Sequence, residues 1–293
     1  MKKRIVLAFA AILPFAIAYA ANQGKTITPV SELAPTEAQG LTGNLVYQFL
    51  SGSNYAYRSL PLDDALSTVI YDNYLESLDG NKLFFLASDI AGFDIYKTSM
   101  DDAIKSRQLD PPFIIFKTYL TRVDERVAYA RGLLKKDFDF TLDEQYLYDR
   151  EDAPWAASAR ELDDIWRQSV KNDVLRLKLA GRPMPEIRET LDKRYALIGE
   201  RVHQLRGDEV FENFMNAYGS AIDPHTSYMS PRSAENFNMS MRLSLEGVGA
   251  VLQVQDDFVM FRTIMPGSPA EKSGAIKVGD RVLAVGQGES GPM

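Results

Sequence analysis

Apolar residues recur every three or four positions through most of this chain, which is the spacing of amphipathic α-helices. The pattern runs from Leu41 to Ile222 almost without a break and starts with Leu41, Leu45 and Phe49. It predicts an all-α domain over residues 41–222. Helical spacing favours core packing, rather than a ligand-binding box, for the aromatic residues of these stripes. The longer stripes lie at residues 62–74, 113–134, 162–177, 187–205 and 210–222.

Local signals predict where several helices begin and end. Asp63 and Asp64 are acids suited to a helix N-terminus, and Asp79-Gly80 predicts the turn that ends the same helix. Ser88 is a candidate N-cap for a short helix over residues 89–93. Pro111-Pro112 opens a helix of roughly 22 residues, because proline is well tolerated in a first helical turn.

The pattern changes at Asp223. Two prolines in the segment 223–231 interrupt the helical periodicity and predict a linker over residues 223–242. Short β-type runs follow, and a short helix is predicted over residues 270–273, between the second and third runs. This order of elements predicts a small α+β module over residues 243–293. The β-type runs lie at residues 248–254, 258–264 and 281–285.

The first 20 residues have the features of an export signal. Lys2-Lys3-Arg4 is a basic start, residues 5–18 carry no charge, and Ala18-Tyr19-Ala20 fits the small-x-small cleavage pattern. The alternative is an uncleaved anchor, although spanning a bilayer takes about 20 apolar residues. We predict a signal peptide at 1–20, a flexible lead-in at 21–40, and a bacterial periplasmic location with membrane contact only through an uncleaved signal.

The composition excludes several classes of binding partner and reactive site. The 293 residues carry a net charge of −7, and removal of residues 1–20 leaves 30 basic against 40 acidic groups. This acidic balance argues against a nucleic-acid partner. The chain has no cysteine, which excludes disulfides and thiol nucleophiles, and its two histidines leave little for a histidine-rich metal site. We predict no metal and no cofactor.

Several segments together resemble a known family. GVGAVL at 247–252, PGSPAEKSG at 266–274 and VGDRVLAV at 278–285 resemble a PDZ domain of the bacterial protease type. DPHTSYMSP at 223–231 and SLEGVG at 244–249 resemble the approach to this domain in carboxy-terminal processing peptidases. YLESLD at 74–79 and FFLASDI at 84–90 resemble the tail-specific protease branch. The resemblance covers residue 41 to the end.

The resemblance implies a mainly α N-terminal domain followed by a partial α+β PDZ-like domain. A PDZ domain takes an extended C-terminal tail as an added strand, and backbone amides bind its carboxylate. By the resemblance, Gly247, Val248 and Gly249 form the carboxylate loop, and the strand from Ala250 to Val254 pairs with the tail. Leu245, Val248 and Val251 are candidates for the apolar wall that receives the last side chain. The alternative is that the glycines only make a tight strand entry.

Catalysis in such proteases would need a serine nucleophile and a lysine base, which the resemblance places in a domain after Met293. Ser268 and Lys272, four apart, could mimic this pair, but they match the start of a PDZ helix. His225 near Asp223 and Ser227 could suggest a triad, although triads usually draw on distant chain segments. We therefore predict no catalytic residue in this chain and no peptide hydrolysis by it.

The sequence accordingly predicts the N-terminal part of an exported serine endopeptidase that acts on proteins with apolar C-terminal tails. This chain is expected to retain only the scaffold and part of the tail-recognition site. An adaptor protein could bind the helical domain. The alternative is a non-enzymatic periplasmic PDZ protein that holds tails for a partner. A trypsin-like protease with an attached PDZ domain is disfavoured, because no β-barrel pattern precedes the module.

Overall fold

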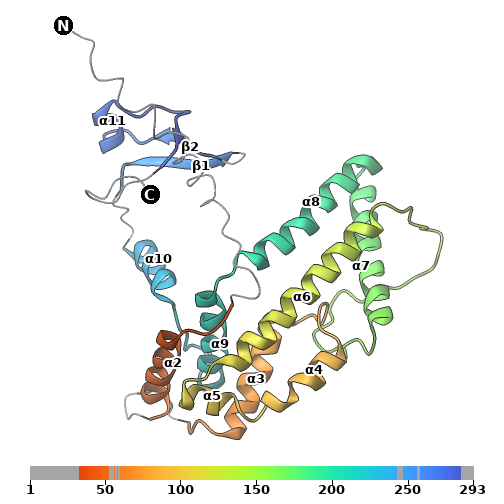
Figure 1. Cartoon of the computed structure of the whole chain (residues 1–293). Helices are drawn as coiled ribbons and strands as arrows, with labels where there is room; N and C mark the ends of the chain where they lie inside the picture. Colours follow the sequence, from red (N-terminus) through yellow and green to blue (C-terminus); the bar gives the residue numbers. More distant parts are fainter. Residues whose placement is uncertain are drawn as a thin grey trace, which may run out of the picture. The chain divides into compact units, whose positions relative to one another are not determined.

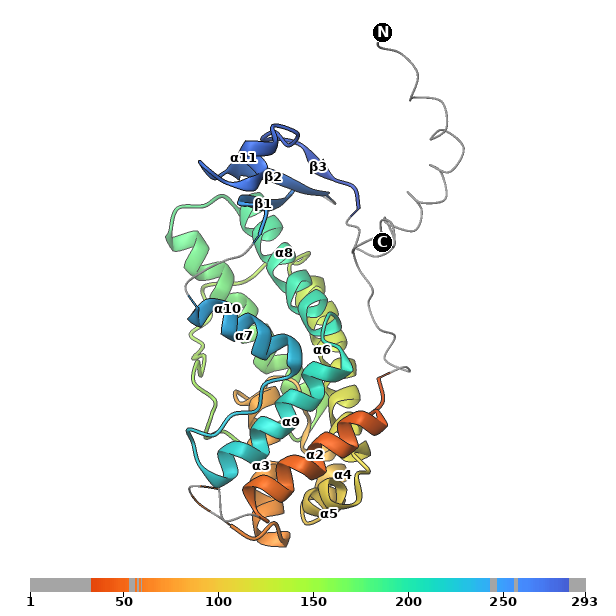
Figure 2. The same cartoon turned by 90° about the vertical axis from the view of Figure 1, so that its left-hand side faces the viewer.

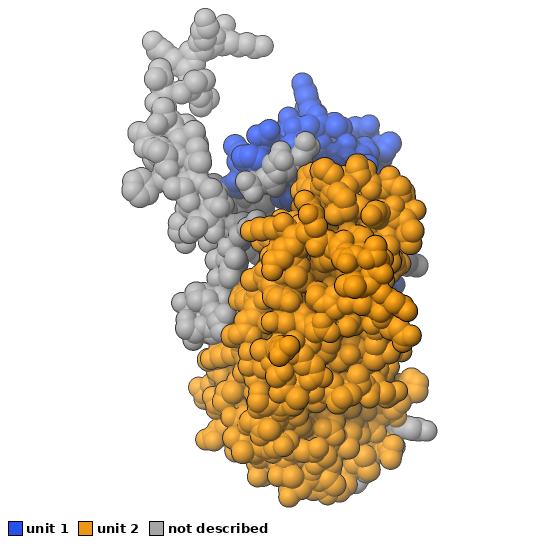
Figure 3. Space-filling view, turned by 90° about the vertical axis from the view of Figure 1, so that its right-hand side faces the viewer, with its two compact units in different colours: residues 1–27, 231–293 blue, residues 28–230 orange. Residues whose placement is uncertain are grey.

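The computed structural model of the chain describes residues 33–52, 56, 58, 60–242, 247–255 and 258–284. They form two compact units, which meet in the sequence at Ser230 and Pro231 and are coloured separately in Figure 3. The first unit is helical, and the second contains a small sheet. The predicted fold class is therefore confirmed. The predicted signal peptide and most of the predicted lead-in lie outside the described residues.

The helical unit is built around one long helix, α6, which runs from one end of the unit to the other (Figures 1 and 2). At one end α6 meets α3, α5 and α9, with α2 packed on α5 and α9, and at the other it packs against α7 and α8. The elements are α2 (Glu37–Leu50), α3 (Asp64–Asp79), α4 (Ala87–Phe93), a 3₁₀ turn (Asp94–Tyr96), α5 (Met100–Ser106), α6 (Asp110–Leu133), α7 (Ala159–Leu179), α8 (Met184–His203) and α9 (Gly207–Ile222).

Two hydrophobic clusters fill this unit. The first cluster comes mainly from α3, α5, the first half of α6 and α9, and includes the fully buried Tyr74 and Phe214, whose rings meet edge to face at 5.7 Å. The second cluster comes from the end of α6 with α7 and α8, and is centred on Trp166. The stripes on α3, α6, α7, α8 and α9 supply the buried residues, as their periodicity predicts.

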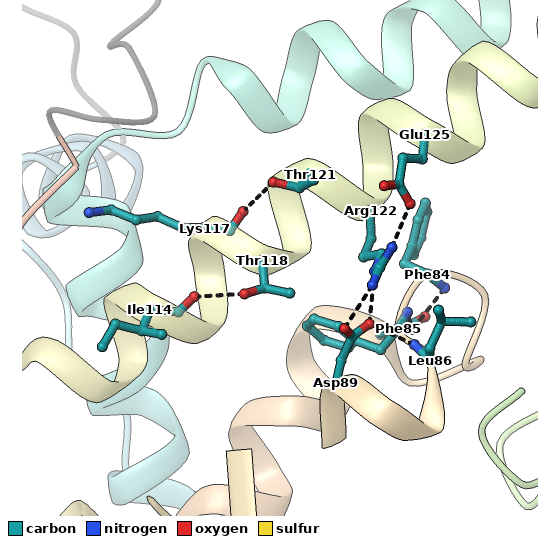
Figure 4. A network of polar contacts seen from close by, with 11 residues as sticks. Phe84, Phe85, Leu86, Asp89, Ile114, Lys117, Thr118, Thr121, Arg122 and Glu125 are labelled. Carbon is teal, nitrogen blue, oxygen red and sulfur yellow. Dashed lines mark hydrogen bonds and ion pairs between the residues drawn. The ribbon is translucent and has the colours of Figure 1, made fainter. Parts of the chain in front are cut away.

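The segment between α3 and α4 joins the two clusters. Phe85 is buried in the first cluster, while Phe84 packs against the second, and the indole Nε1 of Trp166 donates to the carbonyl of Leu83 at 2.6 Å. Figure 4 shows a contact between α6 and α4, the helix that follows this segment. The guanidinium of Arg122 on α6 donates to both carboxylate oxygens of Asp89 on α4, at 2.8 and 2.9 Å.

Helix ends agree with the sequence in three cases and differ in two others. Helix α3 ends at Asp79, as the Asp79-Gly80 turn predicts, and α6 begins at Asp110 with its two prolines in the first turn. Asp63 caps α3, since its carboxylate accepts from the N–H of Leu66 at 3.0 Å. The predicted cap of α4 was wrong: the helix begins at Ala87, and the carboxylate of Asp89 accepts from the N–H of Leu86. The lead-in predicted at 21–40 also needs correction, because α2 begins at Glu37.

Helix α2 turns its apolar stripe outward. Leu45 and Phe49 are 68% and 58% exposed, and the buried positions of α2 are Gln39, Gly40 and Gly43. A Cβ on Gly40 would lie 2.6 Å from the carbonyl oxygen of Arg107. The backbone of α2 therefore comes close to its neighbours through its glycines, and a second set of apolar residues, Val46, Tyr47 and Leu50, packs against the first cluster.

Residues 223–230, here called the return segment, turn back along α9. A Cβ on Gly219 would meet the carbonyl oxygen of Thr226 at 3.0 Å, and the N–H of Tyr228 donates to Oδ1 of Asn216 at 2.7 Å. The rings of Tyr228 and Phe211 meet edge to face at 5.3 Å. The first part of the predicted linker thus belongs to the helical unit, and its second part is a helix, α10 (Pro231–Met241).

The C-terminal unit carries an antiparallel sheet in the order β1-β2-β3. Its strands are β1 (Ala250–Gln255), β2 (Phe258–Ile264) and β3 (Arg281–Val282), and the short helix α11 (Pro269–Ser273) lies beside the β1–β2 hairpin (Figures 1 and 2). The register pairs Ala250 with Ile264 and Gln255 with Phe258, with a bulge between Val251 and Leu252. Strand β2 has the predicted bounds and α11 begins one residue earlier than predicted, whereas β1 begins two residues later than predicted and β3 ends at Val282.

Candidate functional site

Strand β1 lies at the end of the sheet. One of its edges pairs with β2, and within the described residues no strand pairs with the other edge. Its side chains are exposed on both faces, with Val251, Leu252 and Val254 at 45%, 48% and 71%. An unpaired edge with exposed apolar side chains can accept a further extended chain.

The loop that leads into β1, residues 247–249, is held by its carbonyl groups. The N–H of Ala270 donates to the carbonyl of Val248 and the N–H of Met265 to that of Gly249, each at 2.9 Å. By contrast, the N–H groups of Gly247, Val248 and Gly249 donate to no acceptor among the described residues. The loop therefore offers three free backbone donors, which is the property of an anion-binding nest.

The two glycines of this loop differ. Gly249 has a φ of +73°, and a Cβ there would lie 2.2 Å from Cβ of Ser268. Only glycine fits that position. At Gly247 a Cβ would meet no atom of the described residues within 4 Å, and its φ lies outside the left-handed region. Of the two glycines, only Gly249 therefore has a conformation and surroundings that require glycine.

The predicted wall residues have different outcomes. Leu245 lies outside the described residues. Val248 and Val251 are 51% and 45% exposed, so they are open to an incoming side chain and not enclosed by the described residues. Leu252 and Val254, which the sequence argument did not single out as wall residues, are similarly exposed on the same strand.

The Ser268–Lys272 pair does not form a dyad. Ser268 is buried at the start of α11, where its hydroxyl oxygen accepts from the N–H of Glu271 at 3.3 Å. The one contact with Lys272 is a backbone bond, from its N–H to the carbonyl of Ser268. The S-x-x-E spacing of an N-terminal helix cap, Ser268 to Glu271, is the signal in the sequence for this arrangement.

His225, Asp223 and Ser227 form a turn and not a triad. Asp223 Oδ1 accepts from the backbone N–H of His225 at 2.7 Å and lies 3.2 Å from its Nδ1. The backbone N–H of His225, with a smaller contribution from its ring, lowers the pKa of Asp223. The imidazole is 92% exposed, and no contact joins it to Ser227 within the described residues. This geometry fits a capped turn at the start of the return segment.

A buried carboxylate lies in the helical unit. Asp79 ends α3 and accepts from the N–H groups of Leu83, Phe84 and Phe85 at 2.7 to 2.9 Å. Burial raises the pKa of Asp79 to about 6, although the three donors and Lys82 act in the opposite direction. Its bonds are all to the backbone of the segment that joins the two clusters, so its role is structural.

Among the described residues, no cluster of three or more His, Cys, Asp or Glu side chains is arranged to hold a metal ion. No helix in the same part of the chain has both the length and the apolarity needed to cross a bilayer.

Comparison with known proteins places this geometry in a family. A family model described as the tail specific protease N-terminal domain matches residues 46–232, and a PDZ domain model matches residues 236–290. The tail-specific protease of Haemophilus influenzae is 40% identical over 232 residues, which are 79% of this chain and 33% of that protein.

Two relatives from Bacillus subtilis match a shorter stretch. The carboxy-terminal processing proteases CtpB and CtpA are 31% and 30% identical over 104 and 99 residues. These stretches are 35% and 33% of this chain and 21% of each relative, so the chain matches a third or less of each of these curated proteins. Because the helical domain model alone covers well over half of its residues, the chain belongs to the tail-specific protease family, in the group of carboxy-terminal processing proteases.

Proposed function

We propose that this chain is the tail-recognition part of an exported serine endopeptidase that selects proteins by their apolar C-terminal tails. The observation that carries the proposal is the loop 247–249 next to the edge of β1 that no described strand pairs with. No described residue accepts from the three N–H groups of this loop, while the carbonyls of Val248 and Gly249 are hydrogen-bonded. A tail would add to β1 as a strand and place its carboxylate on the loop. Val248 and Val251 would contact its last side chain.

The protease activity is proposed from the relatives, which are named proteases and extend well beyond the matched region. The periplasmic location is proposed from the export features of residues 1–20. The helical unit would serve as a scaffold, and binding of an adaptor to it stays a prediction.

A peptide pair tests the recognition. We expect the chain to bind a peptide of about ten residues that ends in valine more tightly as the free acid than as the C-terminal amide, because only the acid carries the charge that the free N–H groups bind. Fluorescence anisotropy of the labelled peptides gives both dissociation constants. Equal affinity for acid and amide would contradict the proposal.

A glycine variant locates the site. Gly249→Ala should weaken binding of the acid at least tenfold, because its methyl group would overlap Ser268 and its φ of +73° is unfavourable for alanine. Gly132→Ala in α6 is the matched control, since its methyl would meet nothing within 4 Å. The control should bind as the unmodified chain does. Unchanged binding by Gly249→Ala would place the tail elsewhere.

A further inference from the structure

The start of α11 is the best-buried part of the C-terminal unit. Among the described residues of this unit, only Ser268 and Ala270 are buried, at 9% and 3% exposure. Both contact the loop 247–249: Ala270 through its N–H to the carbonyl of Val248, and Ser268 through its Cβ against Gly249. The loop is therefore supported from α11, a segment that follows it by about 20 residues.

Ser268 contributes two separate groups. Its hydroxyl caps α11 by accepting from the N–H of Glu271, and the carboxylate of Glu271 accepts in turn from the N–H of Gly267 at 2.6 Å. Its Cβ faces Gly249, at a distance that leaves no room for a side chain there. The cap fixes the backbone of residues 267–271. Because the Cβ of Ser268 packs against Gly249, the position of this backbone restricts the position of the loop.

The two carbonyl hydrogen bonds alone do not fix the backbone conformation at Gly249. The hydrogen bonds to the carbonyls of Val248 and Gly249 fix the positions of these two oxygens. The backbone dihedral angles of Gly249 can still change, because glycine has no Cβ to restrict them. The Cβ of Ser268 blocks movement of Gly249 toward α11. The direction of the free N–H groups then depends on this contact.

We propose that Ser268 is a positioning residue for tail recognition: its Cβ, pressed against Gly249, holds the free N–H groups of residues 247–249 in the direction that binds a carboxylate. Ser268, at the start of α11, then determines how strongly the loop prefers a free C-terminal carboxylate over a C-terminal amide, although it does not touch the tail. This inference rests on the proposed function of the loop.

Two substitutions separate the contact from the cap. Ser268→Ala keeps the Cβ and removes the hydroxyl, while Ser268→Gly removes both. Glycine is a better N-cap residue than alanine, so Ser268→Gly should disturb the stability of α11 less than Ser268→Ala. A merely structural role predicts that Ser268→Ala is the more damaging change in every assay. A positioning role predicts that Ser268→Gly is the more damaging change for acid discrimination.

The assay is the ratio of dissociation constants for the amide and the free acid of the valine-ending peptide, measured with the whole chain. We expect Ser268→Gly to reduce this ratio at least fivefold and Ser268→Ala to keep it within twofold. The urea midpoint should fall more for Ser268→Ala. Ser273→Ala is the control within α11, because the hydroxyl of Ser273 donates to the carbonyl of Ala270, away from the loop.

The outcomes distinguish the two proposals. If the unmodified chain prefers the acid and Ser268→Gly keeps that preference, the positioning role is wrong while tail recognition stands. The positioning role is also wrong if Ser268→Ala loses the preference as fully as Ser268→Gly. If the unmodified chain shows no preference, the proposed function of the loop fails first, and the role of Ser268 fails with it.

Discussion

Replacement of Asp79 tests how the two hydrophobic clusters of the helical unit are joined. Its carboxylate accepts three consecutive N–H groups, from Leu83, Phe84 and Phe85. Those residues connect the clusters, with Phe85 buried in the first and Phe84 packed against the second. Asp79→Ala removes the acceptor for all three donors at once.

The size of the effect follows from the burial of the donors. The N–H of Phe85 is buried and those of Leu83 and Phe84 are partly buried. A buried donor left without a partner costs about 1–3 kcal/mol, and a partly buried one costs less because water reaches it. We therefore expect Asp79→Ala to lower the free energy of unfolding by about 3 kcal/mol at pH 4.5. Asp72→Ala, an exposed carboxylate on the same helix, should change it by less than about 0.5 kcal/mol.

The effect should depend on pH, with a sign set by the pKa of Asp79. Burial raises that pKa from 3.8 to about 6. A carboxyl group with a higher pKa in the folded protein than in the unfolded chain makes the folded protein less stable as pH rises through that interval. At about 1.4 kcal/mol per pKa unit, the free energy of unfolding of the unmodified chain should fall by about 2 kcal/mol relative to that of the variant between pH 4.5 and pH 8. The destabilisation by Asp79→Ala should then shrink to about 1 kcal/mol.

Urea unfolding of the whole chain, followed by circular dichroism at 222 nm at both pH values, measures these differences. The signal reports chiefly the helical unit. A destabilisation that grows from pH 4.5 to pH 8 would refute the reasoning, because it would show that the three N–H donors lower the pKa of Asp79 by more than burial raises it. A destabilisation below 1 kcal/mol at pH 4.5 would show that water satisfies the donors.

Three further predictions concern other parts of the chain. Asp63→Ala should cost about 1 kcal/mol of unfolding free energy through loss of the α3 cap, whereas its neighbour Asp64→Ala should cost less than half of that; urea unfolding decides. Asn216→Ala should speed chymotrypsin cleavage after Tyr228, because the return segment loses its bond to α9; an unchanged rate would show that ring packing alone holds it. Protein recovered from a bacterial periplasm should begin at Ala21 by mass spectrometry, and an intact Met1 on membrane-bound material would contradict the export prediction.

Much of the helical unit could be predicted from the sequence, because helices depend on residues three and four positions apart. The stripes on α6, α7 and α8 predict the helices and the faces they bury. The acids Asp63 and Asp64 mark the start of α3 in the sequence, and the structure shows that Asp63 is the one that caps it. The order of strands and helix near Gly249 and Ser268 predicts a small α+β module, and the resemblance of these segments to a known family indicates that the module is PDZ-like.

The tertiary structure decided what depends on residues far apart in the chain. The apolar stripe of α2 faces outward because Gly40 approaches the backbone of Arg107, a contact that no periodicity records. The return segment belongs to the helical unit because Asn216 happens to present an acceptor to Tyr228.

The same limit applies to the candidate site. The sequence pattern marks Gly247 and Gly249 alike, but only the fold shows that Ser268 lies against the second and leaves the first open. Local sequence fixes the conformations that a segment favours. Which partner lies within van der Waals distance is fixed only when the remote segments pack, and at Gly249 that partner determines why glycine is required.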